Sequence, residues 1–403
     1  MTTEHTLQQT PSGQEPPMTS IAFVSETWAP EINGVAHTLH QLAGKLVSRG
    51  FELQLIRPVP LDGSTDPDVT HELQVRSIPI PDYEGVRMGR PCSHRLSRFW
   101  KAHRPDVVYI ATEGPLGLSA LNTARRLGLP VVSGFHTNFD QYSQHYIMLK
   151  VLRPFVRPFL RRFHNRSAVT LVPTRFQADA LTNYGYNNVE VMGRGLDNER
   201  FSPSHRRASL RQDWKAKDNT LVFLYVGRLA AEKNMPLMIQ ALEQVHERYP
   251  DVRAVFVGDG PMKRELETRL PWAIFAGFRE GDELAAYYAS ADIFIFPSRS
   301  ETFGNVVTEA MASGLACIAF NYAAAGELIE HGQEGQLVDY TDDQGFIDAT
   351  LSLVEDTEHV RQMGEAARER VLSLTWSSIC DQFIKYLHQA QEVSDARAQL
   401  SNV

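Results

Sequence analysis

Two glutamates separated by seven residues, Glu301 and Glu309, stand where a predicted loop passes into a predicted helix. Carboxylates accept hydrogen bonds from the hydroxyl groups of sugars and ribose. The N-terminus of a helix carries free N–H groups and a partial positive charge, both of which favour phosphate. Carboxylates for hydroxyls beside amide donors for a diphosphate are what a nucleotide sugar requires. Either glutamate alone would also fit a solvated side chain on the exposed face of an α/β domain.

The local pattern predicts the elements that carry these glutamates. The apolar run 293–296 predicts a buried strand. Phe303 and Gly304 predict a turn, in which the glycine lets the backbone approach a ligand closely. From Asn305 and Val306 onward, apolar residues recur at helical spacing. The order strand, loop, helix therefore places the helix N-terminus between the two carboxylates.

Two cations, Arg228 and Lys233, straddle the loop that follows another strong strand pattern at 220–227. Two positive charges at such a loop suit a diphosphate that gains charge as it leaves. The alternative is that both side chains are solvated, as loop cations usually are.

Strand and helix patterns alternate in both halves of the chain, which predicts parallel βαβ units. Gly34 lies in the loop after the first strand, where turn geometry alone could explain a glycine. No G-x-G-x-x-G follows that strand, and this argues against a nicotinamide-dependent oxidoreductase.

Composition indicates a globular protein of two or three domains in 403 residues. The N-terminus lacks the basic start and apolar core of a signal peptide, and the three cysteines are far apart, which fits a reduced, cytosolic protein. Residues 1–205 carry 21 Lys and Arg against 18 Asp and Glu, whereas the remainder carries 19 against 30. The net charge of −8, without a binding motif, argues against a nucleic-acid partner.

The motif E-x7-E, with Phe-Gly after its first glutamate and E-A-M-A-S-G at its end, resembles the signature of the family-4 retaining glycosyltransferases with the GT-B fold. G-R-L with a lysine five residues after the arginine is similar to that family's diphosphate-binding pair. G-F-H-T lies where the family places a histidine at the donor-sugar site. The resemblance covers Ile21 to Leu387 and implies an α/β chain of two Rossmann-like domains with a cleft between them.

The domain boundaries follow from this resemblance together with composition. We expect a disordered tail at 1–18, which is polar and contains proline. An N-terminal acceptor domain at 19–200 and a C-terminal nucleotide-sugar domain at 201–375 would follow. An amphipathic helix at 376–393 would return to the first domain, as it does in GT-B enzymes.

The resemblance implies transfer of a hexose, of mannose or glucose type, from a nucleotide diphosphate sugar to an acceptor hydroxyl with retention of configuration. The implied catalytic residues are His136, Arg228, Lys233 and Glu301. The implied substrate-binding residues are Gly34, Gly277, Phe278, Phe303, Gly304, Asn305, Val306 and Glu309. Glu301 would hold sugar hydroxyls, Glu309 ribose hydroxyls, and His136 would contact the sugar near the reacting carbon.

The donor stays open between GDP-mannose and a UDP-hexose. In a front-face displacement the leaving phosphate oxygen takes the acceptor proton, so no carboxylate nucleophile is required. We expect no cofactor and no metal ion, since the D-x-D string Asp66-Pro67-Asp68 lies in a Pro-rich loop with no strand before it.

A basic, apolar stretch at 150–166 carries six cations, and no acidic residue occurs from 141 to 178. Its proposed membrane patch consists of Arg153, Arg157, Arg161 and Arg162. Arginines interleaved with apolar side chains suit an anionic membrane surface. The alternative is a helix that packs its apolar face on its own sheet and leaves its arginines in solvent.

The strings S-E-T-W-A-P-E-I-N-G-V and G-R-G-L-D are similar to those of bacterial α-mannosyltransferases and glycolipid synthases. We therefore expect a cytoplasmic enzyme, peripheral on the inner face of the membrane, that acts on a lipid such as diacylglycerol or a glycolipid. Two alternatives stay open: the same chemistry on a soluble sugar or small alcohol, and a non-catalytic nucleotide-sugar-binding protein.

Overall fold

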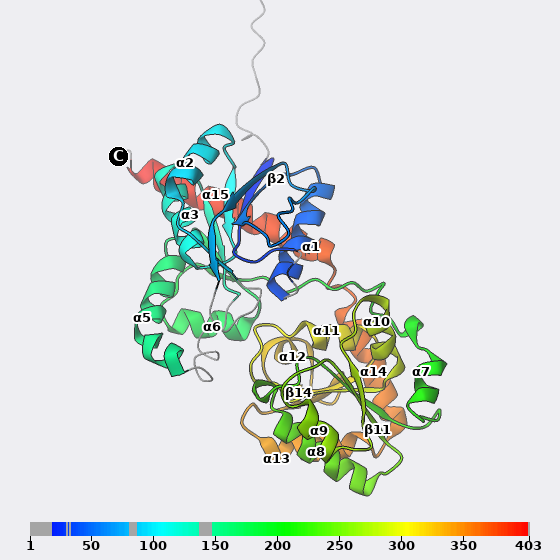
Figure 1. Ribbon diagram of the computed structural model, residues 1–403. Coiled ribbons are helices and arrows are strands. Elements are labelled where there is room, and N and C mark those ends of the chain that lie inside the picture. The colour runs from blue at the N-terminus through cyan, green and yellow to red at the C-terminus, as the bar shows by residue number, and fades with distance from the viewer. Residues whose placement is uncertain (1–17, 30, 32–33, 80–86, 137–146, 402–403) are drawn as a thin grey trace, which may run out of the picture.

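Two parallel β-sheets with helices on their faces form two domains, which confirms the predicted α/β class (Figure 1). The first sheet has the strand order β3-β2-β1-β6-β7-β8-β9, and the second has the order β12-β11-β10-β13-β14-β15. The computed structural model describes residues 18–29, 31, 34–79, 87–136 and 147–401, without the side chains of 147–155 and 401.

The N-terminal domain has the strands β1 (Ser20–Val24), β2 (Glu52–Pro58), β3 (His71–Val75), β6 (Val107–Ile110), β7 (Val131–Gly134), β8 (Val169–Val172) and β9 (Val189–Val191), with the small antiparallel pair β4 (Ser77–Pro79) and β5 (Arg87–Gly89). Its helices are α1 (Gly34–Ser48), α2 (Ser93–Ala102), α3 (Pro115–Arg126), α5 (Ile147–His164) and α6 (Arg175–Asn183).

The C-terminal domain has the strands β10 (Val222–Val226), β11 (Arg253–Val257), β12 (Ile274–Gly277), β13 (Ile293–Phe296), β14 (Ala316–Phe320) and β15 (Gly335–Val338). Its helices are α7 (Ala208–Asp213), α8 (Met235–Arg248), α9 (Lys263–Arg269), α10 (Gly281–Ser290), α11 (Asn305–Ala312), α12 (Ala323–Leu328), α13 (Asp343–Leu353) and α14 (Thr357–Val371), with short 3-10 turns η1 (Pro203–His205) and η2 (Ala231–Lys233). A long helix, α15 (Trp376–Ser401), follows.

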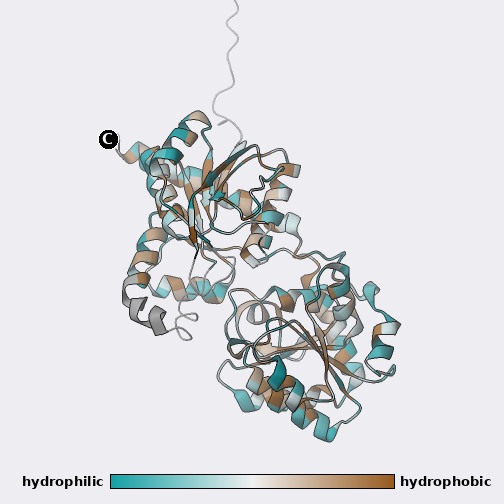
Figure 2. Ribbon diagram, viewed as in Figure 1, coloured by the Kyte–Doolittle hydropathy of each residue, from teal (hydrophilic) through white to brown (hydrophobic). Residues whose placement is uncertain are grey.

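The central strands form where the sequence has short apolar runs. β6 and β13, for example, are buried along their whole length. Helices that cover both faces of a parallel sheet leave no face for solvent, so its strands are hydrophobic throughout. Figure 2 shows this as hydrophobic colour concentrated in the strands of both domains.

Each sheet reverses its strand order at one point. In the second sheet, β11 and β12 lie on one side of β10, whereas β13, β14 and β15 lie on the other. In the first sheet the reversal falls between β1 and β6. The crevice outside the carboxyl ends of strands at such a point is where open α/β sheets bind ligands.

The chain crosses between the domains twice, and the two crossing segments pair with each other. Leu196 N donates to Leu374 O at 2.7 Å, and Leu196 also forms a β-bridge with Thr375. Gly195 packs so closely that a Cβ there would lie 2.4 Å from the Trp376 ring. The two crossing segments are therefore bonded to each other and form one connection between the domains.

Helix α15 packs on the N-terminal domain, against α1 and the strands β6, β7 and β8. Phe383 and Leu387 are fully buried in the core that also contains Ile21 and Phe23. The helix extends beyond the predicted end at 393. Met18, which the prediction placed in the tail, is buried in the same core; residues 1–17 lie outside the described residues.

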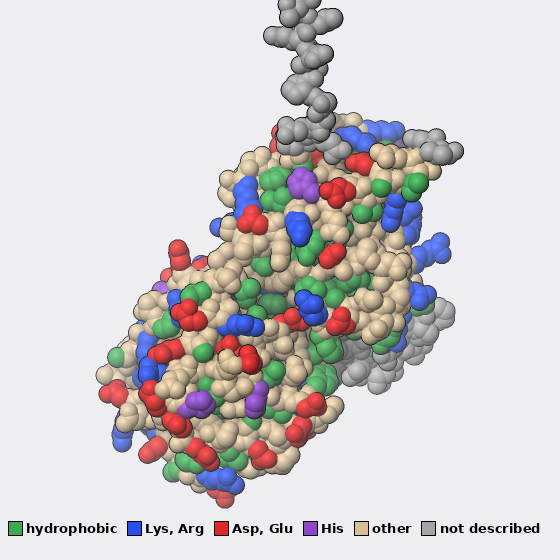
Figure 3. Space-filling model, turned by 180° about the vertical axis from the view of Figure 1, so that it is seen from behind, with side chains coloured by type: hydrophobic (Ala, Val, Ile, Leu, Met, Phe, Trp, Pro, Cys, Tyr) green, Lys and Arg blue, Asp and Glu red, His purple; other side chains and the backbone are tan. Residues whose placement is uncertain are grey.

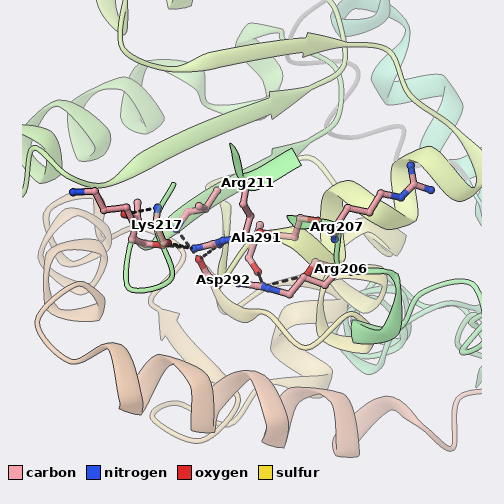
Figure 4. A network of polar contacts seen from close by, with 10 residues as sticks. Arg206, Arg207, Arg211, Lys217, Ala291 and Asp292 are labelled. Carbon is pink, nitrogen blue, oxygen red and sulfur yellow. Dashed lines mark hydrogen bonds and ion pairs between the residues drawn. The ribbon is translucent and has the colours of Figure 1, made fainter. Parts of the chain in front are cut away.

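A buried ion pair fixes the amino ends of β10 and β13, the strands that flank the second reversal point (Figure 4). Asp292 Oδ2 accepts hydrogen bonds from Arg211 Nη1 at 2.9 Å and from Val222 N at 3.0 Å. Arg211 also donates to the carbonyls of Lys217 and Thr220, each at 2.8 Å. The side chains of Arg211 and Asp292 are only 8% and 19% exposed, so solvent screens the pair weakly.

We expect Asp292→Asn to lower the free energy of unfolding by about 3 kcal/mol, because it leaves the Arg211 guanidinium buried without an anion. Urea denaturation measures the change. Asp381→Asn is the matched control, since Asp381 is 69% exposed in its pair with Arg49, and exposed pairs contribute about 0–1 kcal/mol. Equal losses in both variants would contradict this role of Asp292.

Candidate active site

The reversal point of the second sheet brings Lys233 and Glu301 into contact, although 68 positions separate them in the sequence. Lys233 ends the 3-10 turn after β10, and Glu301 lies in the loop after β13. Lys233 Nζ lies 2.5 Å from Glu301 Oε1, which also accepts a hydrogen bond from Ser298 Oγ at 2.6 Å. A cation that could bind phosphate and a carboxylate that could bind hydroxyls thus lie side by side.

The loop after Glu301 presents the amino end of α11 to the same place. Gly304 precedes the helix with φ 92° and ψ 60°, a left-handed conformation that favours glycine. No side chain caps α11 and no acidic residue lies in its first turn, so its first amides, including those of Asn305 and Val306, are open to an anion. Phe303 is buried and its carbonyl accepts a hydrogen bond from Ala324 N at 2.8 Å, which holds the loop.

Glu309 lies one turn inside α11, partly buried, and accepts a hydrogen bond from Tyr288 Oη at 2.9 Å. Burial disfavours the charged carboxylate and raises the pKa of Glu309 to about 7, although the Tyr288 hydrogen bond and the charge of Arg200 act in the opposite direction. The group therefore changes charge close to neutral pH.

The other predicted residues of the C-terminal domain lie at neighbouring strand ends. Arg228 follows β10, and its side chain is 64% exposed and pairs with Glu232 at 3.3 Å. Gly277 ends β12 with φ 72°, and Phe278 after it is 61% exposed. An exposed aromatic ring at this edge has a free face on which a base could stack.

On the other side of the cleft, His136 follows β7 and is 7% exposed. Its ring is held on both nitrogens: Nδ1 lies 2.9 Å from Arg194 Nη2, and Nε2 lies 2.8 Å from Tyr109 Oη. Thr302 Oγ1 lies 3.5 Å from the carbonyl oxygen of His136, so the loop of Glu301 reaches the N-terminal domain here. The structure thus brings His136 next to the loop that carries Glu301.

Gly34 is the first residue of α1, and apart from its chain neighbours and the backbone of its own helix, no atom of the described residues lies within 4 Å of the position its Cβ would take. Packing within the protein therefore does not explain a glycine here. A ligand that approached this helix end would explain it.

A pocket of about 460 Å³ opens beside Glu301 and is lined from both domains. Most of its lining is aromatic or aliphatic. The lining includes the apolar side chains of Phe135, Leu160, Phe176 and Leu181, beside Glu301 and Thr302.

Comparison with known proteins decides the family. Residues 32–200 match the family model described as Glycosyltransferase Family 4, and residues 206–370 match that of Glycosyl transferases group 1. The GDP-mannose-dependent alpha-mannosyltransferase of Mycolicibacterium smegmatis is 33% identical over 369 residues, which cover 90% of this chain and 96% of that protein. The chain is a family-4 glycosyltransferase.

Two further comparisons extend this result. The alpha-monoglucosyldiacylglycerol synthase of Streptococcus pneumoniae is 26% identical to this glycosyltransferase over 334 residues, covering 79% of this chain and 74% of that one. The crystal structure of Anabaena Alr3699/HepE in complex with UDP superposes with a TM-score of 0.73 at 20% identity, covering 92% of this chain and all of the other. The predicted GT-B fold is confirmed.

The proposed membrane patch of the glycosyltransferase lies on α5. Arg161 and Arg162 are exposed, Arg157 is half-buried, and the side chain of Arg153 lies outside the described residues. Phe163 is 2% exposed and packs in the core, whereas Phe159, one turn earlier, is 39% exposed. The helix therefore divides its apolar residues between the core and the surface.

Two charged residues beside the predicted site, the buried Arg194 and the half-buried Glu26, were not among the predicted site residues. Arg194 lies inside the string G-R-G-L-D and Glu26 inside S-E-T-W, and the letters of neither string mark the charged residue as part of a site. Glu26 lies at the reversal point of the first sheet, where Glu26 Oε1 accepts from Leu116 N at 3.2 Å and Glu26 N donates to Thr112 Oγ1 at 3.0 Å. Burial, with the nearby charge of Glu113 as a smaller cause, raises the pKa of Glu26 to about 7.

The D-x-D string has local structural contacts. Asp66 Oδ2 accepts from Trp28 Nε1 at 2.6 Å, and Asp66 Oδ1 accepts from Asp68 N at 3.0 Å. Within the described part of the chain, no group of three or more His, Cys, Asp or Glu side chains is arranged to hold a metal ion.

The pKa of Glu309 predicts that donor binding depends on pH. Below pH 7 the carboxyl group is mostly protonated and accepts hydroxyl hydrogen bonds poorly, so affinity for a nucleotide sugar should fall about 10-fold per pH unit below the pKa. Calorimetry between pH 6 and 8 with a nucleotide sugar, whose diphosphate does not ionise in that range, measures this.

Glu309→Gln is the control for this titration. It should bind more weakly than the wild type at pH 8 and show no such pH dependence. Wild-type affinity that stays constant from pH 6 to 8 would contradict the proposed contact between Glu309 and ribose.

Proposed function

We propose that this glycosyltransferase moves a hexose, with retention of configuration, from GDP-mannose or a UDP-hexose to a hydroxyl of a membrane lipid. The observation that carries the donor half of this proposal is the contact between Lys233 and Glu301 at the reversal point of the second sheet. It puts a charge for the diphosphate next to a carboxylate for the sugar.

The geometry suggests how the reaction proceeds. Lys233, Arg228 and the first amides of α11 would stabilise the charge that develops on the leaving diphosphate. Glu301 would hold the sugar hydroxyls. The bond between the sugar carbon and the phosphate oxygen breaks as the acceptor oxygen bonds to the same face of that carbon, and the acceptor proton passes to the departing phosphate oxygen.

Three observations support a lipid as acceptor. One relative is named alpha-monoglucosyldiacylglycerol synthase. A largely apolar pocket opens beside Glu301, where the apolar part of an acceptor could lie. Helix α5 forms one wall of that pocket and exposes Phe159 beside Arg161 and Arg162, a combination that suits an anionic membrane surface.

Charge is also distributed unevenly between the domains. Figure 3 shows acidic side chains spread over the C-terminal domain and Lys and Arg side chains along one edge of the N-terminal domain. No helix in the described part of the chain is both long and apolar enough to cross a membrane. We propose that the enzyme meets the membrane from the cytoplasmic side, as a peripheral protein, through its N-terminal domain.

A donor screen tests the reaction. Purified protein, vesicles that contain diacylglycerol, and one nucleotide sugar at a time should yield glycolipid from a single donor, with the product anomer read by NMR.

Lys233→Met should lower the transfer rate about 100- to 1,000-fold, because it removes a charge that stabilises the leaving group. Lys385→Met, on the exposed face of α15, is the control and should have no effect.

The other outcomes of this screen are informative. Sugar transferred only to soluble acceptors would replace the lipid with a soluble substrate. Nucleotide binding without transfer from any donor would show a non-catalytic binding protein. An inverted anomer would exclude the retaining mechanism.

Membrane docking has its own test. Each arginine near an anionic surface contributes about 1 kcal/mol, and 1.4 kcal/mol is a tenfold change, so replacing Arg157, Arg161 and Arg162 by Gln should weaken vesicle binding about 100-fold. Flotation with phosphatidylglycerol vesicles measures it. The same replacement of the exposed residues Arg248, Arg264 and Arg370 in the C-terminal domain is the charge-matched control. Equal losses in both triple variants would argue against docking through α5.

A further inference from the structure

Arg194 is a buried cation in the first crossing segment, between β9 and the C-terminal domain. It is 6% exposed, and Nη2 donates to His136 Nδ1 at 2.9 Å. Its other terminal nitrogen, Nη1, is buried and has no hydrogen-bond partner among the described residues. No carboxylate in the described part of the chain forms an ion pair with it.

The charge of Arg194 persists despite this burial. Desolvation lowers its pKa to about 10, which still leaves the guanidinium protonated at neutral pH. A buried charge without an anion destabilises a fold, so such a residue calls for a functional explanation.

The contact with Arg194 determines which form of His136 is present. A guanidinium has only donors, so Nδ1 of His136 must accept with its lone pair and carry no proton. In the neutral ring the proton is then on Nε2, which donates to Tyr109 Oη at 2.8 Å. An imidazolium would set an N–H against an N–H at Arg194.

The surroundings of the ring support the same form. Burial lowers the pKa of His136 well below its usual value, and the charge of Arg194 and then that of His164 act in the same direction. Among the described residues, the charged and titratable groups around the ring are Tyr109 on β6, His164 on α5, Arg194, and Glu113, which lies 3.3 Å from His164 Nε2. Gly134 leaves room for the ring, because a Cβ there would lie 2.4 Å from His136 Nε2.

We propose that Arg194 is a positioning residue: it locks His136 as the neutral tautomer with the proton on Nε2 and fixes its ring beside the sugar-binding loop. The inference rests on the proposed function for its consequence, because His136 lies next to Thr302 and Glu301 on the sugar side of the cleft. A ring with both nitrogens occupied neither protonates nor removes a proton from the substrate. The fixed His136 ring would contact the donor sugar with a constant shape and charge.

The position of Arg194 also links this ring to the crossing between the domains. Arg194 lies two residues before Leu196, which pairs with Leu374 and Thr375 of the second crossing segment. A displacement of the crossing would therefore move the group that holds His136.

The direct test is the tautomer of His136 by ¹⁵N NMR, with His136→Gln to assign its signals. In the wild type we expect the neutral form with a proton on Nε2 throughout the range from pH 8 to pH 5. In Arg194→Met the ring loses its donor and its neighbouring charge, so it should begin to titrate closer to the ordinary pKa of about 6.5. Arg194→Lys, which keeps the charge and one donor, should restore the wild-type tautomer at least in part.

Kinetics give the second readout. Loss of ring positioning should lower kcat about 10- to 100-fold in Arg194→Met, with the dissociation constant for the nucleoside diphosphate nearly unchanged. Arg370→Met, at an exposed site of the C-terminal domain, is the charge-matched control. The NMR measurement needs no turnover, so it tests the role of Arg194 even if the protein transfers sugar from none of the donors.

Two results would overturn the proposal. One is a His136 ring in Arg194→Met that stays neutral with the same tautomer as in the wild type. The other, which does not require any variant to fold, is a wild-type His136 ring that becomes protonated between pH 8 and pH 5 or that carries its neutral proton on Nδ1.

Discussion

The adjacency of β10 and β13 is the constraint on which the proposed donor site depends. The strand order reverses between them, so the loops at their carboxyl ends diverge and leave a crevice. The backbone therefore places Lys233 against Glu301 and turns the amino end of α11 toward the same point. At the amino ends of the same two strands, Asp292 bonds to Arg211 and to the backbone of Val222. This ion pair fixes the position of β10 relative to β13 and therefore the positions of the loops at their carboxyl ends.

The paired crossing segments add a second constraint, on how the two halves of the site meet. Leu196 and Leu374 are hydrogen-bonded, so neither crossing can shift without the other. The proposed donor-binding groups belong to one domain, whereas His136 belongs to the other and is held by Arg194 of the first crossing segment. The geometry of the proposed site thus depends on the connection between the domains as well as on the two sheets.

Local patterns in the sequence sufficed for the strands and helices, whereas the arrangement in two Rossmann-like domains came from the family resemblance. The run 293–296 is the strand β13, the helix expected from Asn305 is α11, and the helix expected from Trp376 is α15. Contacts between distant residues were beyond such patterns, because sequence spacing does not show that Lys233 reaches Glu301. Arg194 was missed because arginine is mostly an exposed residue, and nothing in G-R-G-L-D marks this one as buried. Amphipathic spacing in α5 likewise could not tell the inward Phe163 from the outward Phe159.

The charge asymmetry connects the two proposed activities. The chain after residue 205 carries 30 acidic against 19 basic residues, yet we expect it to bind an anionic donor. Because its net charge repels an anion, binding must depend on local groups such as Lys233 and the α11 amides. The preceding half, with 21 basic against 18 acidic residues, is weakly positive and carries α5. Near an anionic membrane the first half would be attracted and the second repelled, which would orient the molecule with the N-terminal domain toward the lipid. An acceptor drawn from that surface would then approach the cleft from the α5 side, where the apolar pocket leads to Glu301.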